Sequence, residues 1–74
     1  MFITNLDGSQ PEDLVEEELR KLFTRYGNVV KLNVKKNKNG LYSFAFLDYE
    51  KAEDALYAIK ELDQYEIFGK RMRV

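Results

Sequence analysis

The chain contains no cysteine and no histidine among its 74 residues. It therefore forms no disulfide framework, and it lacks the usual ligands of a zinc site. It also has no imidazole for general acid or base catalysis. These absences exclude a disulfide-rich scaffold and argue against an enzyme, and we expect neither a metal ion nor a cofactor.

Long hydrophobic runs are also missing. No apolar run approaches the ~20 residues that cross a bilayer, and no secretory signal pattern is present, so we expect no contact with a membrane. A chain of this length supports one hydrophobic core, which predicts a single domain over residues 1–74. Apolar residues make up 45% of the chain and charged residues 34%, a composition typical of a globular protein.

Hydrophobic spacing predicts a strand and then a helix in the first third of the chain. Residues 1–6 (MFITNL) alternate and are followed by the turn residues Asp7-Gly8-Ser9, which indicates a strand. We expect the helix to begin between Pro11 and Val15, with capping boxes available at Ser9/Glu12 and Asp13/Glu16, and to end at Gly27. Its apolar stripe consists of Leu14, Val15, Leu19, Leu22, Phe23 and Tyr26.

The remaining residues predict a hairpin, a second helix and a last strand. Val30, Leu32 and Val34 alternate with polar residues, and Asn39-Gly40 favours a tight turn with positive φ at both positions, so residues 41–49 form the antiparallel partner. The second helical stripe consists of Ala52, Ala55, Leu56, Ile59 and Leu62. Residues 65–68, Gly69 and residues 70–74 read as a turn followed by a short strand.

This order of elements predicts an α+β fold, the ferredoxin-like βαββαβ sandwich. Two crossovers of the same hand place both helices on one face of a four-stranded antiparallel sheet. The other face of the sheet then has no cover.

The strand over residues 41–49 is apolar on both sides. Its small and aliphatic side suits packing under helices, which leaves Phe44 and Phe46 on the bare face, together with Phe2 and Thr4 of the first strand. The alternative is that these rings form the core. That reversal would expose aliphatic residues, including Ile3, and would lose more burial than it gains. An exposed aromatic patch of this kind indicates a binding surface.

Charge is divided between the helices and the sheet, although the net charge is only −1. The two helical regions, residues 7–26 and 50–63, hold 11 acidic and 5 basic residues, whereas the strands and turns hold 7 basic and 2 acidic ones. Four cationic residues alternate along their strands so that their side chains should flank the aromatic patch: Lys31, Lys35, Arg71 and Arg73. Aromatic rings surrounded by cations are typical of surfaces that bind single-stranded nucleic acid.

At these residues the sequence resembles the RNA recognition motif family, over essentially all 74 positions. MFITNL is similar to the family's hexamer, and YSFAFLDY (residues 42–49) is similar to its octamer, in a form like that of serine/arginine-rich splicing factors. Two positions depart from the family pattern, because Tyr42 replaces a basic residue that would meet a phosphate and Ser43 replaces a glycine.

The resemblance implies that Phe2 and Phe46 each stack a base and that Phe44 inserts against the sugars between them. It implies further contacts to base edges or backbone. The complete set of candidate RNA-binding residues is Phe2, Thr4, Lys31, Asn33, Lys35, Tyr42, Phe44, Phe46, Arg71 and Arg73.

The leading hypothesis is therefore a monomeric, non-catalytic domain that binds single-stranded RNA in RNA processing. The resemblance implies an intracellular location, in the nucleus or the cytoplasm, and slightly favours the nucleus. The alternative is a protein interaction module that docks a peptide or a second copy through the aromatic face or the acidic helices. An acylphosphatase-like hydrolase of the same topology is third, because the sequence has no glycine loop that would cradle a phosphate.

Overall fold

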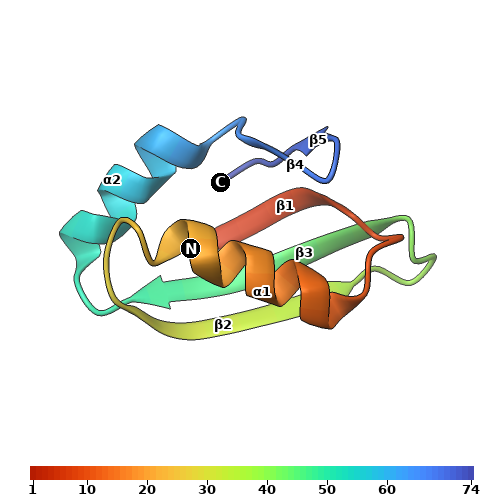
Figure 1. Ribbon diagram of the computed structural model, residues 1–74, viewed down its shortest axis with the longest axis horizontal. Coiled ribbons are helices and arrows are strands. Elements are labelled where there is room, and N and C mark those ends of the chain that lie inside the picture. The colour runs from red at the N-terminus through yellow and green to blue at the C-terminus, as the bar shows by residue number, and fades with distance from the viewer.

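Five strands and two helices make up the computed structural model, which describes all of residues 1–74 (Figure 1). Neither helix is long and apolar enough to span a membrane. In chain order the elements are β1 (Phe2–Asp7), α1 (Glu12–Phe23), β2 (Val29–Lys36), β3 (Tyr42–Tyr49), α2 (Ala52–Leu62), β4 (Glu66–Ile67) and β5 (Lys70–Arg71).

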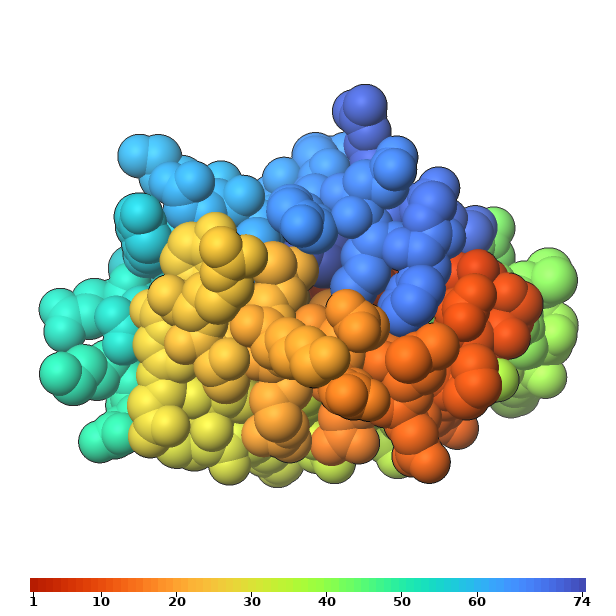
Figure 2. Space-filling model, viewed as in Figure 1, coloured from red at the N-terminus to blue at the C-terminus, as the bar shows by residue number.

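The central layer is a three-stranded antiparallel sheet in the order β1-β3-β2. In Figure 1 α1 crosses in front of this sheet, and α2 lies toward one end of it. Figure 2 shows the same side as a filled surface, on which α1 lies against the C-terminal segment. The core between sheet and helices is formed by inward-facing residues of both layers, among them Ile3, Leu19, Phe23, Ala45 and Leu47, all fully buried.

A four-stranded sheet was predicted, and the C-terminal segment departs from this prediction. Residues 66–71 fold into their own hairpin, β4-β5, whose two-residue turn places Phe68 at φ 51° and Gly69 at φ 78°. The chain then meets the edge of β1 at one bridge, where the Thr4 and Arg73 backbones exchange hydrogen bonds of 2.8 and 3.0 Å. A bulge in β1 beyond Thr4 bends that edge away and limits the pairing to this position.

The β2-β3 hairpin forms as predicted, with two local differences. β2 is bulged between Val29 and Lys31, so Val30 is the extra residue and is 60% exposed instead of facing the core. In the turn only Gly40 has positive φ, at 71°; Asn39 does not. The Gly40 amide donates to the Asn37 carbonyl, so a β-turn precedes the one left-handed residue.

Both helices form where the apolar stripes predict them, but the end of one helix and the buried residues of the other differ from the prediction. α1 begins within the expected interval but ends at Phe23 rather than Gly27, and the following residues continue as tightened turns. Neither capping box forms, because Pro11 is the N-cap residue of α1 and makes no side-chain hydrogen bond. In α2 the buried face includes Ala58, which the stripe omitted, while Leu56 is 70% exposed.

Tyr49, the last residue of β3, joins the sheet to the end of α1. Its hydroxyl donates a 2.7 Å hydrogen bond to the Phe23 carbonyl, and the side chain is buried. Burial raises the pKa of Tyr49 to about 12, and the Asp54 carboxylate and Tyr26 add to that rise.

We expect Tyr49→Phe to lower the free energy of unfolding by about 0.5–1.5 kcal/mol at neutral pH, because the bond to Phe23 is lost. The folded-state pKa of about 12 exceeds the ordinary value of 10.0. The hydroxyl's contribution is therefore complete below pH 10 and is lost as the pH rises through about 12. Denaturant titrations should show that the difference in unfolding free energy between parent and variant becomes smaller as the pH rises from 10.0 to about 12. A constant difference would contradict this role of the Tyr49 hydroxyl.

Candidate nucleic-acid interface

Three phenylalanines form one cluster on the sheet face that the helices leave uncovered. Ring centroids are 4.9 Å apart for Phe2 and Phe46, 5.8 Å for Phe2 and Phe44, and 6.0 Å for Phe44 and Phe46. Phe2 is 49% exposed and Phe46 45% exposed, whereas Phe44 is half-buried between its neighbours. Their alternation partners Ser43, Ala45 and Leu47 are buried, so the predicted parity of β3 is confirmed.

The predicted polar residues of β2 lie beside this cluster. Residues directly opposite each other in antiparallel strands point to the same face. In the observed register Lys35 is opposite Phe44, Asn33 is opposite Phe46, and Lys31 is opposite Asp48. All three β2 side chains are exposed, so the structure brings two ammonium groups and an amide to one border of the aromatic cluster.

A hollow of about 440 Å³ adjoins the cluster on the side of β1 and the C-terminal segment. Its lining combines aromatic rings, short polar side chains and one guanidinium: Phe2, Thr4, Asn5, Tyr42, Ser43, Phe44 and Arg73. The hollow thus contains five of the ten predicted RNA-binding residues. Arg71 is exposed but does not line it.

Asn5 shapes the hollow and was not among the predicted site residues. It occupies the left-handed region at φ 63° inside the β1 bulge. Because of this bulge, the side chain of Leu6 rather than that of Asn5 points into the core. Its side-chain amide donates a 2.7 Å hydrogen bond to the Arg71 carbonyl. Asn tolerates positive φ better than most residues. An asparagine between two inward-facing aliphatic residues of the strand was therefore the sequence feature that could have indicated this bulge.

Lys70 is the second residue that the sequence prediction left out. Its ammonium nitrogen lies 4.9 Å from the centroid of the Tyr42 ring, at the start of β3. Tyr42 is 44% exposed and stands opposite Asp7 in the β1-β3 register. A hydrogen bond from the Ser9 backbone amide lowers the pKa of Asp7, and the Ser9 hydroxyl adds to this effect, so that carboxylate is ionised at neutral pH.

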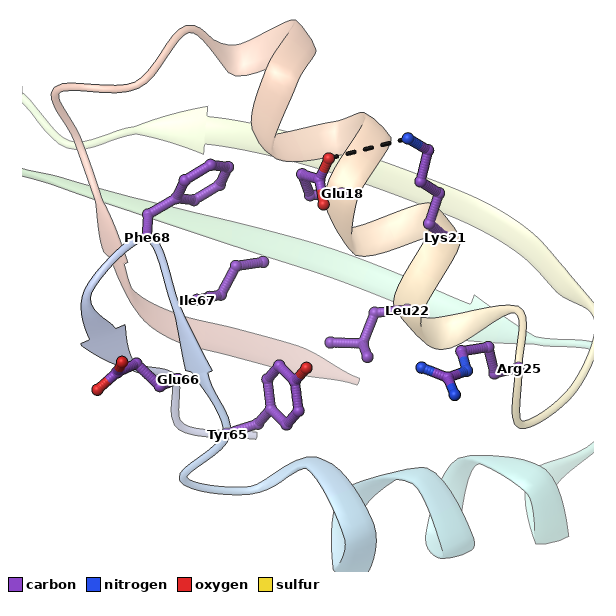
Figure 3. Close-up of a pocket in the computed structure, with 8 residues that line it drawn as sticks. All are labelled: Glu18, Lys21, Leu22, Arg25, Tyr65, Glu66, Ile67 and Phe68. Atoms are coloured by element: carbon purple, nitrogen blue, oxygen red, sulfur yellow. Dashed lines mark ion pairs between the residues drawn. The ribbon is translucent and has the colours of Figure 1, made fainter.

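A second hollow, of about 360 Å³, lies on the helical side between α1 and the β4-β5 hairpin (Figure 3). Leu22, Tyr65, Ile67 and Phe68 contribute its apolar lining. Its charged side chains are mixed in sign, and the Glu18–Lys21 ion pair drawn in Figure 3 spans 3.9 Å. This hollow is separated from the aromatic cluster by the sheet, and it contains none of the predicted RNA-binding residues.

An α+β fold with two helices on one face of an antiparallel sheet, and three grouped aromatic rings on the other, is the architecture of a class of domains whose members stack nucleobases on sheet aromatics. The comparisons with known proteins agree with this class. The chain matches the RNA recognition motif family over residues 1–73 and belongs to that family.

Two curated relatives and one solved structure illustrate the similarity. The chain is 36% identical over its full length to heterogeneous nuclear ribonucleoprotein Q of Arabidopsis thaliana, of which it covers 14%. It is 34% identical over 67 residues, 90% of the chain, to the probable splicing factor arginine/serine-rich 3 of Caenorhabditis elegans, of which it covers 25%. The third RNA recognition motif of Pes4 superposes with a TM-score of 0.80 at 25% identity, covering 97% of this chain and 82% of that one. The chain therefore spans a quarter or less of the two curated relatives.

We expect Asn5→Ala to lower the free energy of unfolding by about 1–2 kcal/mol, because alanine tolerates the left-handed conformation poorly and the bond to Arg71 is lost. Asn5→Gly loses the same hydrogen bond but accommodates the positive φ, so it should cost less. Chemical denaturation of both variants makes the comparison. Equal losses would show that the backbone conformation at this bulge is not what selects asparagine.

Proposed function

We propose that the uncovered sheet face binds single-stranded RNA by stacking bases on Phe2 and Phe46, without catalysis. The observation that carries this proposal is the cluster of three rings within 6.0 Å of one another, two of them about half exposed. An aromatic ring in water exposes apolar area that a nucleobase can cover, and stacking on it is tolerant of sequence. We assign to Phe44, which is half-buried between the other rings, a contact with the sugars that connect the stacked bases.

Electrostatics favour a polyanion on this face and disfavour one on the opposite face. Lys31 and Lys35 border the rings on β2, and Arg73 lines the adjoining hollow. The helical regions carry the excess of acidic residues. A strand of RNA is therefore attracted to the sheet and repelled by the helices, which orients the domain before any base is bound.

Family membership and the names of the relatives support a role in RNA processing. The relatives include a ribonucleoprotein and a probable splicing factor. We propose an intracellular location, in the nucleus or the cytoplasm, and RNA as the principal partner, bound by a monomer.

Replacement of either stacking ring should weaken binding while leaving the fold intact. We expect Phe2→Ala and Phe46→Ala each to cost ~1–3 kcal/mol of binding free energy, because each removes one stacking platform. Fluorescence anisotropy with a labelled pool of short randomised single-stranded RNA measures the loss.

Tyr57→Ala is the matched control, since Tyr57 is a 54% exposed aromatic residue on α2. It should bind like the parent. Parent-like affinity in both phenylalanine variants would rule out stacking. No RNA binding by the parent, together with a dimer in sedimentation that hides Phe44 and Phe46, would instead support the protein interaction module.

Affinity should also decrease as salt increases, because cations of the sheet face displace counterions from the phosphates. Each neutralised phosphate contributes about −0.7 to the slope of log K against log salt concentration. Lys35→Gln should make this slope shallower, whereas Lys60→Gln, which removes an exposed charge on α2, should not. A slope of zero in the parent would contradict an electrostatic role for the cations beside the rings.

A further inference from the structure

Lys70 differs from every other lysine of the chain in its burial. The other seven are exposed, whereas Lys70 is half-buried, with its ammonium over the ring of Tyr42 at 4.9 Å from the centroid. A cation within about 6 Å of an aromatic face is attracted to it. Lys70 therefore holds one position more firmly than a lysine that extends into solvent, and its charge stands at the start of β3, beside Tyr42.

This ammonium takes part in no ion pair, although the Asp7 carboxylate lies near enough to attract it. The four ion pairs of the structure involve the Met1 ammonium, Arg20 and Lys21, and none includes Lys70. Asp7, which faces Tyr42 across the register, is the acidic group beside it. The Asp7 carboxylate already accepts hydrogen bonds from the Ser9 amide at 2.9 Å and the Ser9 hydroxyl at 2.8 Å. The hydrogen-bonding capacity of Lys70 is thus left for a ligand.

The hollow beside the aromatic cluster supplies the place for that ligand. Tyr42 is shared, since its ring both lines the hollow and holds Lys70. Arg73 lines the same hollow, whereas Lys70 does not line it but stands over the Tyr42 ring that does. Rings and short polar groups below, with cations at the margin, suit a nucleotide whose sugar and base enter the hollow and whose phosphate stays at the margin.

We infer that Lys70, held in place by Tyr42, binds a phosphate of the RNA strand at the margin of this hollow. The inference rests on the proposed function, because it assigns one more contact to the same strand. Tyr42 acts through Lys70 as a positioning residue, because its ring holds the ammonium at 4.9 Å from the ring centroid. A cation from β5 thereby supplies the charge that residue 42 itself lacks.

The test compares Lys70→Gln with the parent by anisotropy, using the labelled pool of short randomised single-stranded RNA at about 50 to 200 mM salt. We expect Kd to rise several-fold at the lowest salt and the slope of log K against log salt to become shallower by about 0.7, the value of one phosphate contact. Lys70→Arg, which keeps the charge, should retain the slope. Lys60→Gln, with the same charge change on α2, should retain both.

The outcomes separate this inference from the proposed function. If the parent binds RNA and Phe46→Ala weakens it, but Lys70→Gln keeps the parental Kd and slope, then the phosphate contact is wrong and stacking stands. If the parent binds no RNA, both are wrong. Circular dichroism and thermal unfolding of Lys70→Gln check that it is folded, and retention of the slope by Lys70→Arg confirms the role of charge.

A double-mutant cycle tests the positioning role of Tyr42. Tyr42→Leu removes the ring that holds the ammonium, so it should weaken binding less when Lys70 is already glutamine. Tyr42→Phe keeps the ring and should bind like the parent. Additive losses in the Tyr42→Leu/Lys70→Gln protein would overturn the positioning role, because Tyr42 would then contact RNA independently of Lys70.

Discussion

One-sided cover of the sheet is the constraint on which the rest of this structure depends. Both helices pack against the same face, so alternate residues of β3 meet opposite environments: Ala45 and Leu47 are buried while Phe46 between them is 45% exposed. A second layer of helices would bury the rings and leave no binding surface. One side of each strand therefore packs in the core, and the other side is left accessible to solvent.

The distribution of charge follows the same division. Because acidic residues are concentrated in the helical regions and basic ones in the strands and turns, a net charge near zero conceals two surfaces of opposite character. The sheet face combines an apolar centre with a cationic border, whereas the hollow on the helical side has charges of both signs. The proposed stacking of bases and neutralisation of phosphates therefore both fall on the sheet face.

Patterns with a fixed period could be interpreted from the sequence. The period of two in β3 correctly predicted that the phenylalanines lie on the uncovered face, and the stripe in α1 correctly predicted Leu19 and Phe23 in the core. These patterns can be interpreted because every residue of a stripe is stabilised by the same burial. Asn39-Gly40 placed the hairpin correctly, since the residues that permit a turn act locally. The bulges at Val30 in β2 and Asn5 in β1 were not predicted. One extra residue in a strand reverses the face to which the following side chains point, and the period does not show where that residue lies.

By itself, the sequence determined the order of the elements, the face on which the aromatic rings lie and the segregation of charge, because each is set by spacing along the chain. Only the tertiary structure decided that residues 66–71 close into a separate hairpin and that Arg73 reaches β1 at Thr4. It alone decided that Lys70 meets Tyr42. Such contacts join residues far apart in the chain, and their geometry depends on how bulges and turns direct the backbone, which no local pattern records.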